Sequence, residues 1–231
     1  MKSSSLLSAL CLAVGIALGG YFVGQGILGH NKTSKIAVKG LAEREVPASI
    51  AIWTLSYSAT DDQLAEVDRK LADGAALVQA FLKEAGFDEA DVALQPPTLR
   101  DHSMETRDKD AQAPAARFSA SQSVLLRTQK VQAVKPAVSA TSTLMRKGLM
   151  LGQVSDPRFF FEDLNSVKPG MIEEATKNAR VAGEQFARDS NTRLGRLLNA
   201  SQGWFQVVDR DEATPERKIV RVIVEVEYEI D

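Results

Sequence analysis

The chain has 231 residues, with 28 lysines and arginines against 30 aspartates and glutamates, so its formal net charge is −2. This balance gives no basic surplus for binding nucleic acid or an anionic membrane surface, and we expect no nucleic-acid partner. A hydrophobic fraction of 44% is enough for a buried core and argues against intrinsic disorder. The single cysteine, Cys11, excludes a disulfide bond within the chain.

An apolar segment at the N-terminus predicts the compartment. Leu6 to Leu28 consists mostly of Leu, Ala, Val, Ile and Gly, and with histidine neutral no charged side chain occurs between Lys2 and Lys32. As a helix this segment would be about 34 Å long, enough to cross a hydrocarbon core of about 30 Å. We therefore predict that residues 1–31 form a single-pass membrane anchor and that residues 32–231 lie outside the cytoplasm.

The segment could instead be a signal peptide or carry a lipid, and its orientation in the membrane has an alternative as well. Ala17-Leu18-Gly19 has the small-x-small form of a cleavage site, so the segment could be a signal peptide that is removed. Lipidation of Cys11 would need a small residue before it, whereas Leu10 stands there. The basic residues that follow the segment would, by the positive-inside rule, keep the large domain in the cytoplasm. We discount this because long translocated domains largely disregard nearby charge.

The soluble part begins with two expected strands. Residues 35–39 predict a short strand that ends at Gly40, and residues 49–58 predict a second one. Apolar side chains alternate along the second strand in a way that predicts burial on much of both faces. Trp53 is expected in the core.

A helix and a hairpin are expected next. Thr60 and Gln63 have the spacing of a capping box, and the three- and four-residue apolar spacing that follows predicts an amphipathic helix over 61–85. This helix should end at Gly86. Residues 91–127 then predict a hairpin around a polar, charged loop.

The same succession is expected in the second half. A helix should begin near Gln129 and end with Gly148 as its left-handed cap. Pro136 should either kink this helix or mark its beginning. Residues 149–162 predict a strand, and Pro169 predicts the start of the next helix.

The last helix and the last strands complete the pattern. The helix carries an alanine-rich stripe that would let its backbone approach a sheet closely. The stripe consists of Ile172, Ala175, Ala179, Ala182 and Phe186. Two strands are expected at 197–208 and 218–230. In the second, valines alternate with charged residues, which predicts one covered face and one wetter face.

The expected elements predict the fold class. Residues 35–128 and 129–231 each show the order strand, helix, strand, strand, which indicates a structural duplication with a period of about one hundred residues. We predict an α+β fold of two similar halves, with helices packed on largely antiparallel sheet and preceded by the transmembrane helix.

The motifs of the soluble part resemble those of the SIMPL domain family of bacterial envelope proteins. Residues 36–40 have the form Ile-x-Val-x-Gly, and an acidic residue and a proline follow at Glu45 and Pro47. An alanine-rich helix then leads through Ala187, Asn191, Leu194 and Gly195 to the final alternating strand. The family usually has glycine where this chain has Asn191, a mild departure because asparagine also tolerates the left-handed conformation.

The resemblance carries functional expectations. It implies a periplasmic location, hence a single-pass inner-membrane protein with its domain in the periplasm. It also implies a link to envelope or oxidative stress in some members and ring-like or cage-like homo-oligomers in others. The family has no catalytic residues, so none can be transferred to this chain.

The residues offer little for metal or acid–base chemistry. Histidine occurs only at His30 and His102, and the one cysteine lies in the apolar segment, so a zinc site with nitrogen and sulfur ligands cannot be built in the soluble part. His102 has Asp101 and Ser103 beside it, but neighbours in sequence rarely face one another as a catalytic triad requires.

The hairpin loop is equally weak as a metal site. Glu105, Asp108 and Asp110 could bind a hard cation, but basic residues neutralise the segment and the spacing differs from that of a calcium loop. A solvated loop is the interpretation we favour. No phosphate-binding or nucleophile-elbow motif occurs. We therefore predict no catalytic, cofactor-binding or metal-binding residues, no cofactor and no enzymatic activity.

Aromatic residues are the remaining candidates for function. Phe159 to Phe161 could mark a contact surface, because neighbouring strand residues point in opposite directions, or they could belong to a strand buried on both faces. Trp204 could be buried or exposed. Our first hypothesis is an anchored homo-oligomer that shields or organises envelope components. The second is a small-ligand or lipid carrier with a cleft between the halves, and the third is an enzyme.

Overall fold

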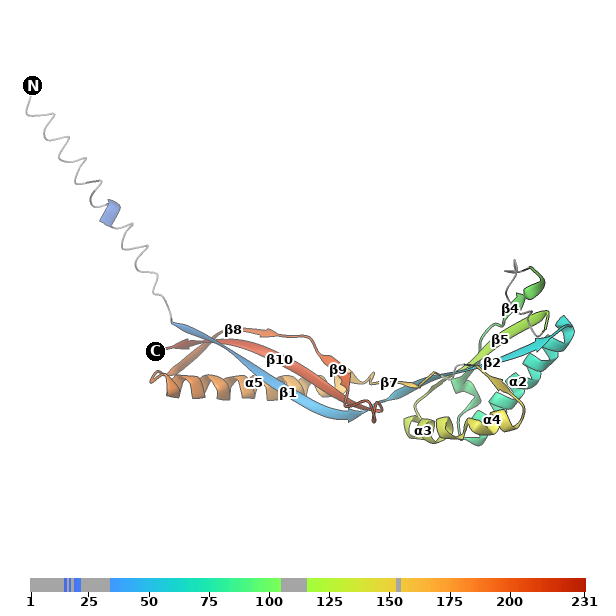
Figure 1. Ribbon diagram of the computed structural model, residues 1–231. Coiled ribbons are helices and arrows are strands. Elements are labelled where there is room, and N and C mark those ends of the chain that lie inside the picture. Colours follow the sequence, from blue (N-terminus) through green and yellow to red (C-terminus); the bar gives the residue numbers. More distant parts are fainter. Residues whose placement is uncertain (1–14, 16, 18, 22–33, 105–115, 153–154) are drawn as a thin grey trace, which may run out of the picture. The chain divides into compact units, whose positions relative to one another are not determined.

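The computed structural model describes residues 15, 17, 19–21, 34–104, 116–152 and 155–231 (Figure 1). In this part of the chain no helix has both the length and the apolarity needed to cross a bilayer. The expected anchor from Leu6 to Leu28 lies outside the described residues except at five positions, so it stays a prediction. Cys11, His30 and the acidic residues from Glu105 to Asp110 also lie outside them.

The described chain forms two sheets with antiparallel pairing, accompanied by helices, which confirms the predicted α+β class. The strands are β1 (Lys35–Pro47), β2 (Ile50–Asp61), β3 (Val92–Leu94), β4 (Thr98–Asp101), β5 (Phe118–Thr128), β6 (Met150–Leu151), β7 (Arg158–Phe160), β8 (Leu194–Gln202), β9 (Gln206–Asp209) and β10 (Arg217–Ile230). The helices are α2 (Leu64–Glu84), α3 (Val131–Ala140), α4 (Ser142–Arg146) and α5 (Leu164–Asp189), with 3-10 turns η1 (Glu89–Asp91) and η2 (His102–Met104).

The strand order is β1-β10-β8 in one sheet, with β9 also pairing with β10, and β3-β5-β2-β6 in the other, with β4 on β5 and β7 on β2. Residue contacts divide the chain into two compact units. Among the described residues, the first unit contains those up to Gly40 with Thr176–Gln202 and Val224–Asp231. The second contains those from Leu41 to Ala175 and Gly203–Ile223. The duplication of residues 35–128 and 129–231 stays a prediction.

The core of the second unit lies between the β2–β5 pair and α2. These strands pair over their whole length, from Ala51 opposite Thr128 to Asp61 opposite Phe118. Alternate side chains of β2, including Trp53 and Tyr57, are buried, and Trp53 lies in the core as predicted. Burial on both faces was also predicted, but after Ile50 the opposite face is only partly buried. Each such large side chain contributes about 1.5–3 kcal/mol to stability by leaving water.

The beginning of α2 differs from the prediction. Gln63 is the N-cap residue but makes no side-chain capping bond, so the predicted capping box is wrong. Thr60 still belongs to β2, and Asp61 accepts a 3.0 Å hydrogen bond from the Gln63 N–H instead. The end of the helix is as predicted, because Gly86 has a φ of 91° and reverses the chain.

Two prolines lie inside helices rather than at their beginnings. Pro136 is within α3, and Pro169 is within α5, which begins at Leu164. A proline at either place deprives the carbonyl four residues earlier of its usual helical N–H partner. The one helix expected from Gln129 to Gly148 is instead two, α3 and α4. Gly148 follows α4 with a φ of 88°, so its predicted left-handed conformation is confirmed. The single strand expected over 149–162 is instead two short strands, β6 and β7, which both pair with β2.

The stripe by which α5 packs also differs from the prediction. Ala182 and Phe186 are exposed, and the buried positions repeat every four residues. They are Met171, Ala175, Ala179, Gly183 and Ala187. In the first unit, a Cβ added to Gly183 would lie 3.2 Å from Leu194 Cδ1, so the small residues mark where the helix comes closest to β8. Asn191 has a φ of 55°, which confirms its left-handed conformation.

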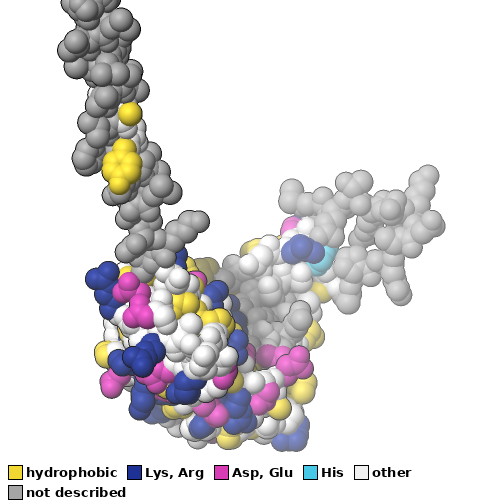
Figure 2. Space-filling view, turned by 90° about the vertical axis from the view of Figure 1, so that its left-hand side faces the viewer, with side chains coloured by type: hydrophobic (Ala, Val, Ile, Leu, Met, Phe, Trp, Pro, Cys, Tyr) yellow, Lys and Arg dark blue, Asp and Glu magenta, His cyan; other side chains and the backbone are white. Residues whose placement is uncertain are grey.

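The last strand, β10, confirms the predicted alternation. Its covered side consists of Val220, Val222, Val224, Val226 and Tyr228, all buried. The opposite side of β10 is called the outer face below. On the side of the molecule shown in Figure 2, basic and acidic side chains are interspersed rather than gathered by sign.

Candidate functional site

A β-bulge interrupts the partner strand of β10. Val224 lies opposite Gln202 on β8, and Arg221 lies opposite Gln206 on β9. Two residues of β10 therefore face three on the partner, Gly203 to Phe205. An unpaired extra residue in one strand is the definition of a bulge, and bulges commonly redirect a side chain toward a functional surface.

The bulge presents Trp204 to solvent. The Gly203 N–H donates a 2.8 Å hydrogen bond to the Ile223 carbonyl, which holds the bulge on β10. Phe205 is half-buried, with the Lys168 ammonium of α5 5.8 Å from its ring centroid. Trp204 is 92% exposed, whereas the other tryptophan, Trp53, is 1% exposed. The bulge thus places a large aromatic side chain of the second unit, Trp204, in solvent.

Apolar residues continue from Trp204 across the outer face. Val208 and Ile223 are exposed, and Ile219, directly opposite Val208, is partly exposed. Cross-strand partners and alternate residues of one strand share a face, so Val208, Ile219 and Ile223 lie on the same side of the sheet. We call Trp204, Val208, Ile219 and Ile223 the Trp204 patch.

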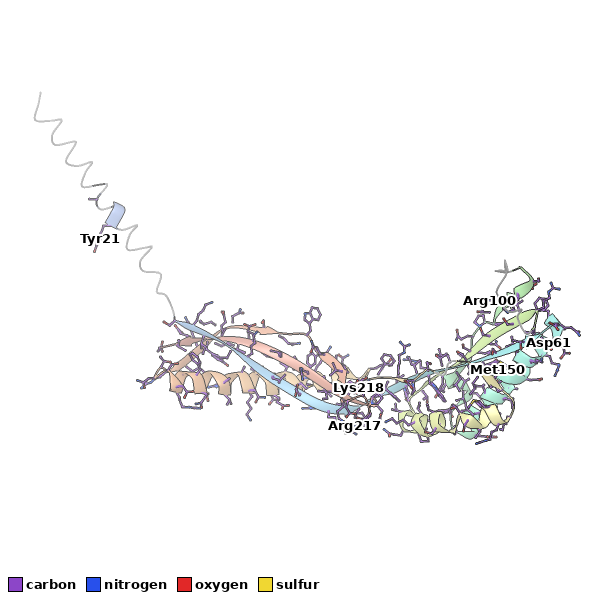
Figure 3. The ribbon with its side chains drawn as sticks, viewed as in Figure 1. Tyr21, Asp61, Arg100, Met150, Arg217 and Lys218 are labelled. Carbon is purple, nitrogen blue, oxygen red and sulfur yellow. The ribbon has the colours of Figure 1, made fainter. Side chains whose placement is uncertain are left out.

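Ion pairs border this patch. Glu45 Oε1 accepts hydrogen bonds of 2.7 Å from Arg217 and 3.0 Å from Arg210, and the bond from Arg217, then that from Arg210, holds the Glu45 pKa below its usual value. Arg221 forms a further ion pair with Glu43. Arg217 and Lys218 are neighbours at the start of β10 (Figure 3), so alternation directs their side chains to opposite faces of the sheet.

The border is electrically balanced and solvent-exposed. Arg210 also pairs with Asp211, so the three arginines of the border, Arg210, Arg217 and Arg221, face three carboxylates. Such exposed pairs contribute little to folding stability, because solvent screens their charges. These ion pairs instead hold the charged side chains in fixed positions around the apolar residues of the patch.

The residues considered for acid–base chemistry are not arranged as a triad. His102 Nε2 lies 2.9 Å from the hydroxyl of Ser119 on β5, not of Ser103. Asp101 instead accepts hydrogen bonds from the Ser103 hydroxyl at 2.7 Å and from Arg117 at 3.2 Å. In the part of the chain that the structure describes, no group of three or more His, Cys, Asp or Glu side chains could hold a metal ion.

The phenylalanine triplet is divided between core and surface. Phe159 is buried in the core of the second unit, Phe160 is exposed, and Phe161 is half-buried. Both interpretations of the triplet are therefore partly correct. Trp53 lies in the core as expected, and its Nε1 has no hydrogen-bond partner among the described residues.

The sequence left Trp204 undecided and did not predict the bulge. An isolated glycine in a strand pattern was the available signal, because Gly203 interrupts an otherwise continuous run from Leu197 to Val208. The same run contains no charged residue and no proline, the residues that usually protect a strand at a sheet edge.

Comparison with protein families matches residues 36–228 to SIMPL, described as a protein of unknown function (DUF541). No curated protein matches the chain. The match begins at the Ile-x-Val-x-Gly strand and ends within β10, so it includes both units and the Trp204 patch. Because it covers most of the 231 residues, the chain belongs to the SIMPL family.

Proposed function

We propose that this SIMPL protein has a structural or binding role as a homo-oligomer, tethered to the inner membrane with its folded part in the periplasm. The observation that supports this proposal is the Trp204 patch. A tryptophan that is 92% exposed keeps a large apolar surface in water unless another molecule covers it. Tryptophan and arginine are also the residues most enriched at the energetic centres of protein interfaces.

The anatomy of the patch favours a protein partner. Interfaces typically have an apolar centre and a polar rim, and here Ile219 and Val208 are bordered by the Glu45 and Glu43 ion pairs. Three arginines and three carboxylates give the border no net charge. Two copies of the same surface therefore meet without a net repulsion, which supports a second copy of the chain as the partner.

Tethering would strengthen such an association. The apolar segment Leu6 to Leu28 supports a membrane anchor by its length. Confining the folded part to a membrane raises the local concentration of copies, so a modest interface can hold an assembly together. The resemblance to envelope proteins supports the periplasmic location and a link to envelope or oxidative stress.

A non-enzymatic role is part of the proposal. Asp101 accepts hydrogen bonds from Arg117 and Ser103, and the His102 ring lies against the hydroxyl of Ser119, which supports a structural role for these side chains. The hydrogen bond between His102 and Ser119 is then a side-chain link across β5 and η2. Broad substrate profiling checks this part, and an activity that is lost in His102→Ala would contradict it.

The proposal is tested by the mass of the full-length protein in detergent. Light scattering over a hundredfold range of concentration should give a multiple of the 25.1 kDa chain mass. A single-chain particle at every concentration would refute the assembly. Intact mass spectrometry of the same sample checks the tether, because a mature N-terminus near residue 20 would show that the segment is removed. Protease added to spheroplasts should digest the folded part if it lies in the periplasm.

A further inference from the structure

A second feature of the molecule lies on the covered side of β9 and β10. In the second unit, a pocket of about 430 Å³ is lined by Phe159, Phe160, Phe161 and Val207 and by the charged residues Arg158, Asp209 and Lys218. This volume lies toward the lower end of the range for small-molecule sites, about 300–1,000 Å³. Asp209 and Lys218 lie directly opposite each other, beside the buried Val220 and away from the Trp204 patch.

The aromatic wall of the pocket is held in place by the backbone. Phe160 lies opposite Ile50 in the β7–β2 pair. The Ser49 N–H donates a 2.8 Å hydrogen bond to the Phe160 carbonyl, and the Glu162 N–H donates a 2.8 Å hydrogen bond to the Ser49 hydroxyl. These bonds fix the C-terminal end of β7, and Arg158 at its other end pairs with Ile52, so a ligand would meet a preformed surface.

Lys218 is the unusual member of this pocket. It is only 6% exposed, and in the described part of the chain its ammonium has one hydrogen-bond and ion-pair partner, Asp209. An ammonium carries three N–H donors, and a buried donor without an acceptor is costly. The Asp209 side chain is 52% exposed, so solvent screens its charge much more than that of Lys218. The ammonium thus retains capacity for a second acceptor.

The charges of the pocket specify the ligand. Arg158 and Lys218 are cationic and Asp209 is anionic, which leaves one positive charge beside an aromatic wall. The Arg158 guanidinium lies 5.8 Å from the Phe160 ring centroid, so this cation is held over the apolar surface. We propose that this pocket binds a small amphiphile with one negative charge, its anionic group on Lys218 and its acyl or aromatic body against Phe160 and Phe161. This site is separate from the proposed assembly surface and does not depend on it.

The test uses full-length protein in detergent and two probes of the same shape, 2-naphthoate and the neutral 2-naphthamide. Calorimetric titration should show binding of 2-naphthoate and at least about tenfold weaker binding of 2-naphthamide, because a charge-assisted hydrogen bond is lost. Decanoate in a third titration distinguishes an acyl from an aromatic body. Absence of binding by both anions, or equal binding of the two naphthyl probes, would overturn the proposal.

Variants locate the site. Lys218→Met keeps the length of the side chain and removes its charge, so it should weaken 2-naphthoate binding by at least about tenfold, whereas Lys218→Arg should retain binding. Phe160→Ala should weaken both naphthyl probes. Trp204→Ala should leave binding unchanged, which separates this site from the assembly surface. Unchanged binding in Lys218→Met would refute the assignment, and if that variant does not fold, the comparison of probes on the wild-type protein still decides.

Discussion

The Gly203 N–H donates a 2.8 Å hydrogen bond to the carbonyl of Ile223, and a Cβ added to Gly203 would lie 2.8 Å from that same oxygen. Real Cβ atoms essentially never come this close to a backbone oxygen, so only glycine fits there without a backbone shift. The bulge that displays Trp204 therefore depends on the residue that precedes it.

Gly203→Ala should disturb the bulge. The backbone must move to relieve the contact with Ile223, which we expect to destabilise the protein by about 1–3 kcal/mol, as overpacking does. Urea unfolding followed by circular dichroism measures this change. Ser201→Ala, two residues earlier on β8, is the matched control and should be nearly neutral. A Gly203→Ala protein as stable as the control would show that the bulge tolerates a side chain.

Gly74→Ala should destabilise the second unit even though alanine favours helices. A Cβ at this position of α2 would lie 2.8 Å from Cε2 of the buried Tyr57 ring. Overpacking by about 1–3 kcal/mol outweighs a gain in helix propensity of about 1 kcal/mol. Gly170→Ala in α5 is the control, because its Cβ would be 3.6 Å from the nearest atom, in Arg44. Equal urea midpoints for the two variants would contradict the packing argument.

Much of this fold could be predicted because its signals are local. The alternation of β10 depends on successive residues of one strand, and the left-handed Asn191 depends on the turn that contains it. In the predicted stripe of α5, Ala175 and Ala179 are buried as expected, whereas Ala182 and Phe186 are exposed. Because α5 comes close to β8, a small residue, Gly183, rather than a large apolar one, occupies the buried position there.

The bulge and the pocket could not be predicted in this way. The register of Gln202 and Gln206 on β10 is set by long-range pairing, so the sequence from 197 to 208 reads as one continuous strand. The pocket likewise joins Phe160 to Lys218, which are far apart in the chain and become neighbours only through β7 and β10. No local pattern marks either juxtaposition.

Asp101→Asn should remove an acid-sensitive contribution to stability. Hydrogen bonds from Arg117 and then Ser103 lower the pKa of Asp101 from 3.8 to about 2. Its ionised form therefore stabilises the fold above pH 3.8, and this contribution is lost as the pH falls through about 2. The difference in melting temperature between wild type and Asp101→Asn should be constant near neutral pH and shrink in that acid window. A difference that does not change with pH would contradict this account.

Tyr57 should make the stability of the fold depend on pH in the alkaline range. Burial raises its pKa from 10.0 to about 12, and its hydroxyl donates a 2.7 Å hydrogen bond to Gln122 Oε1. The unfolded chain loses the phenol proton first, so stability should fall as the pH rises between these two values. Tyr57→Phe should lack this part of the decline and cost about 0.5–1.5 kcal/mol at neutral pH through the lost hydrogen bond. Urea midpoints with parallel pH dependence for both proteins would show that Tyr57 does not contribute.

We expect copies of the chain to associate through the Trp204 patch, so Trp204→Ala should lower the mass of the particle. The matched control is Met150→Ala, which removes another exposed apolar side chain of the second unit (Figure 3). Light scattering of the full-length proteins in detergent, at equal concentrations, should give an assembled particle for wild type and Met150→Ala and a smaller one for Trp204→Ala. An unchanged mass for Trp204→Ala would contradict the account.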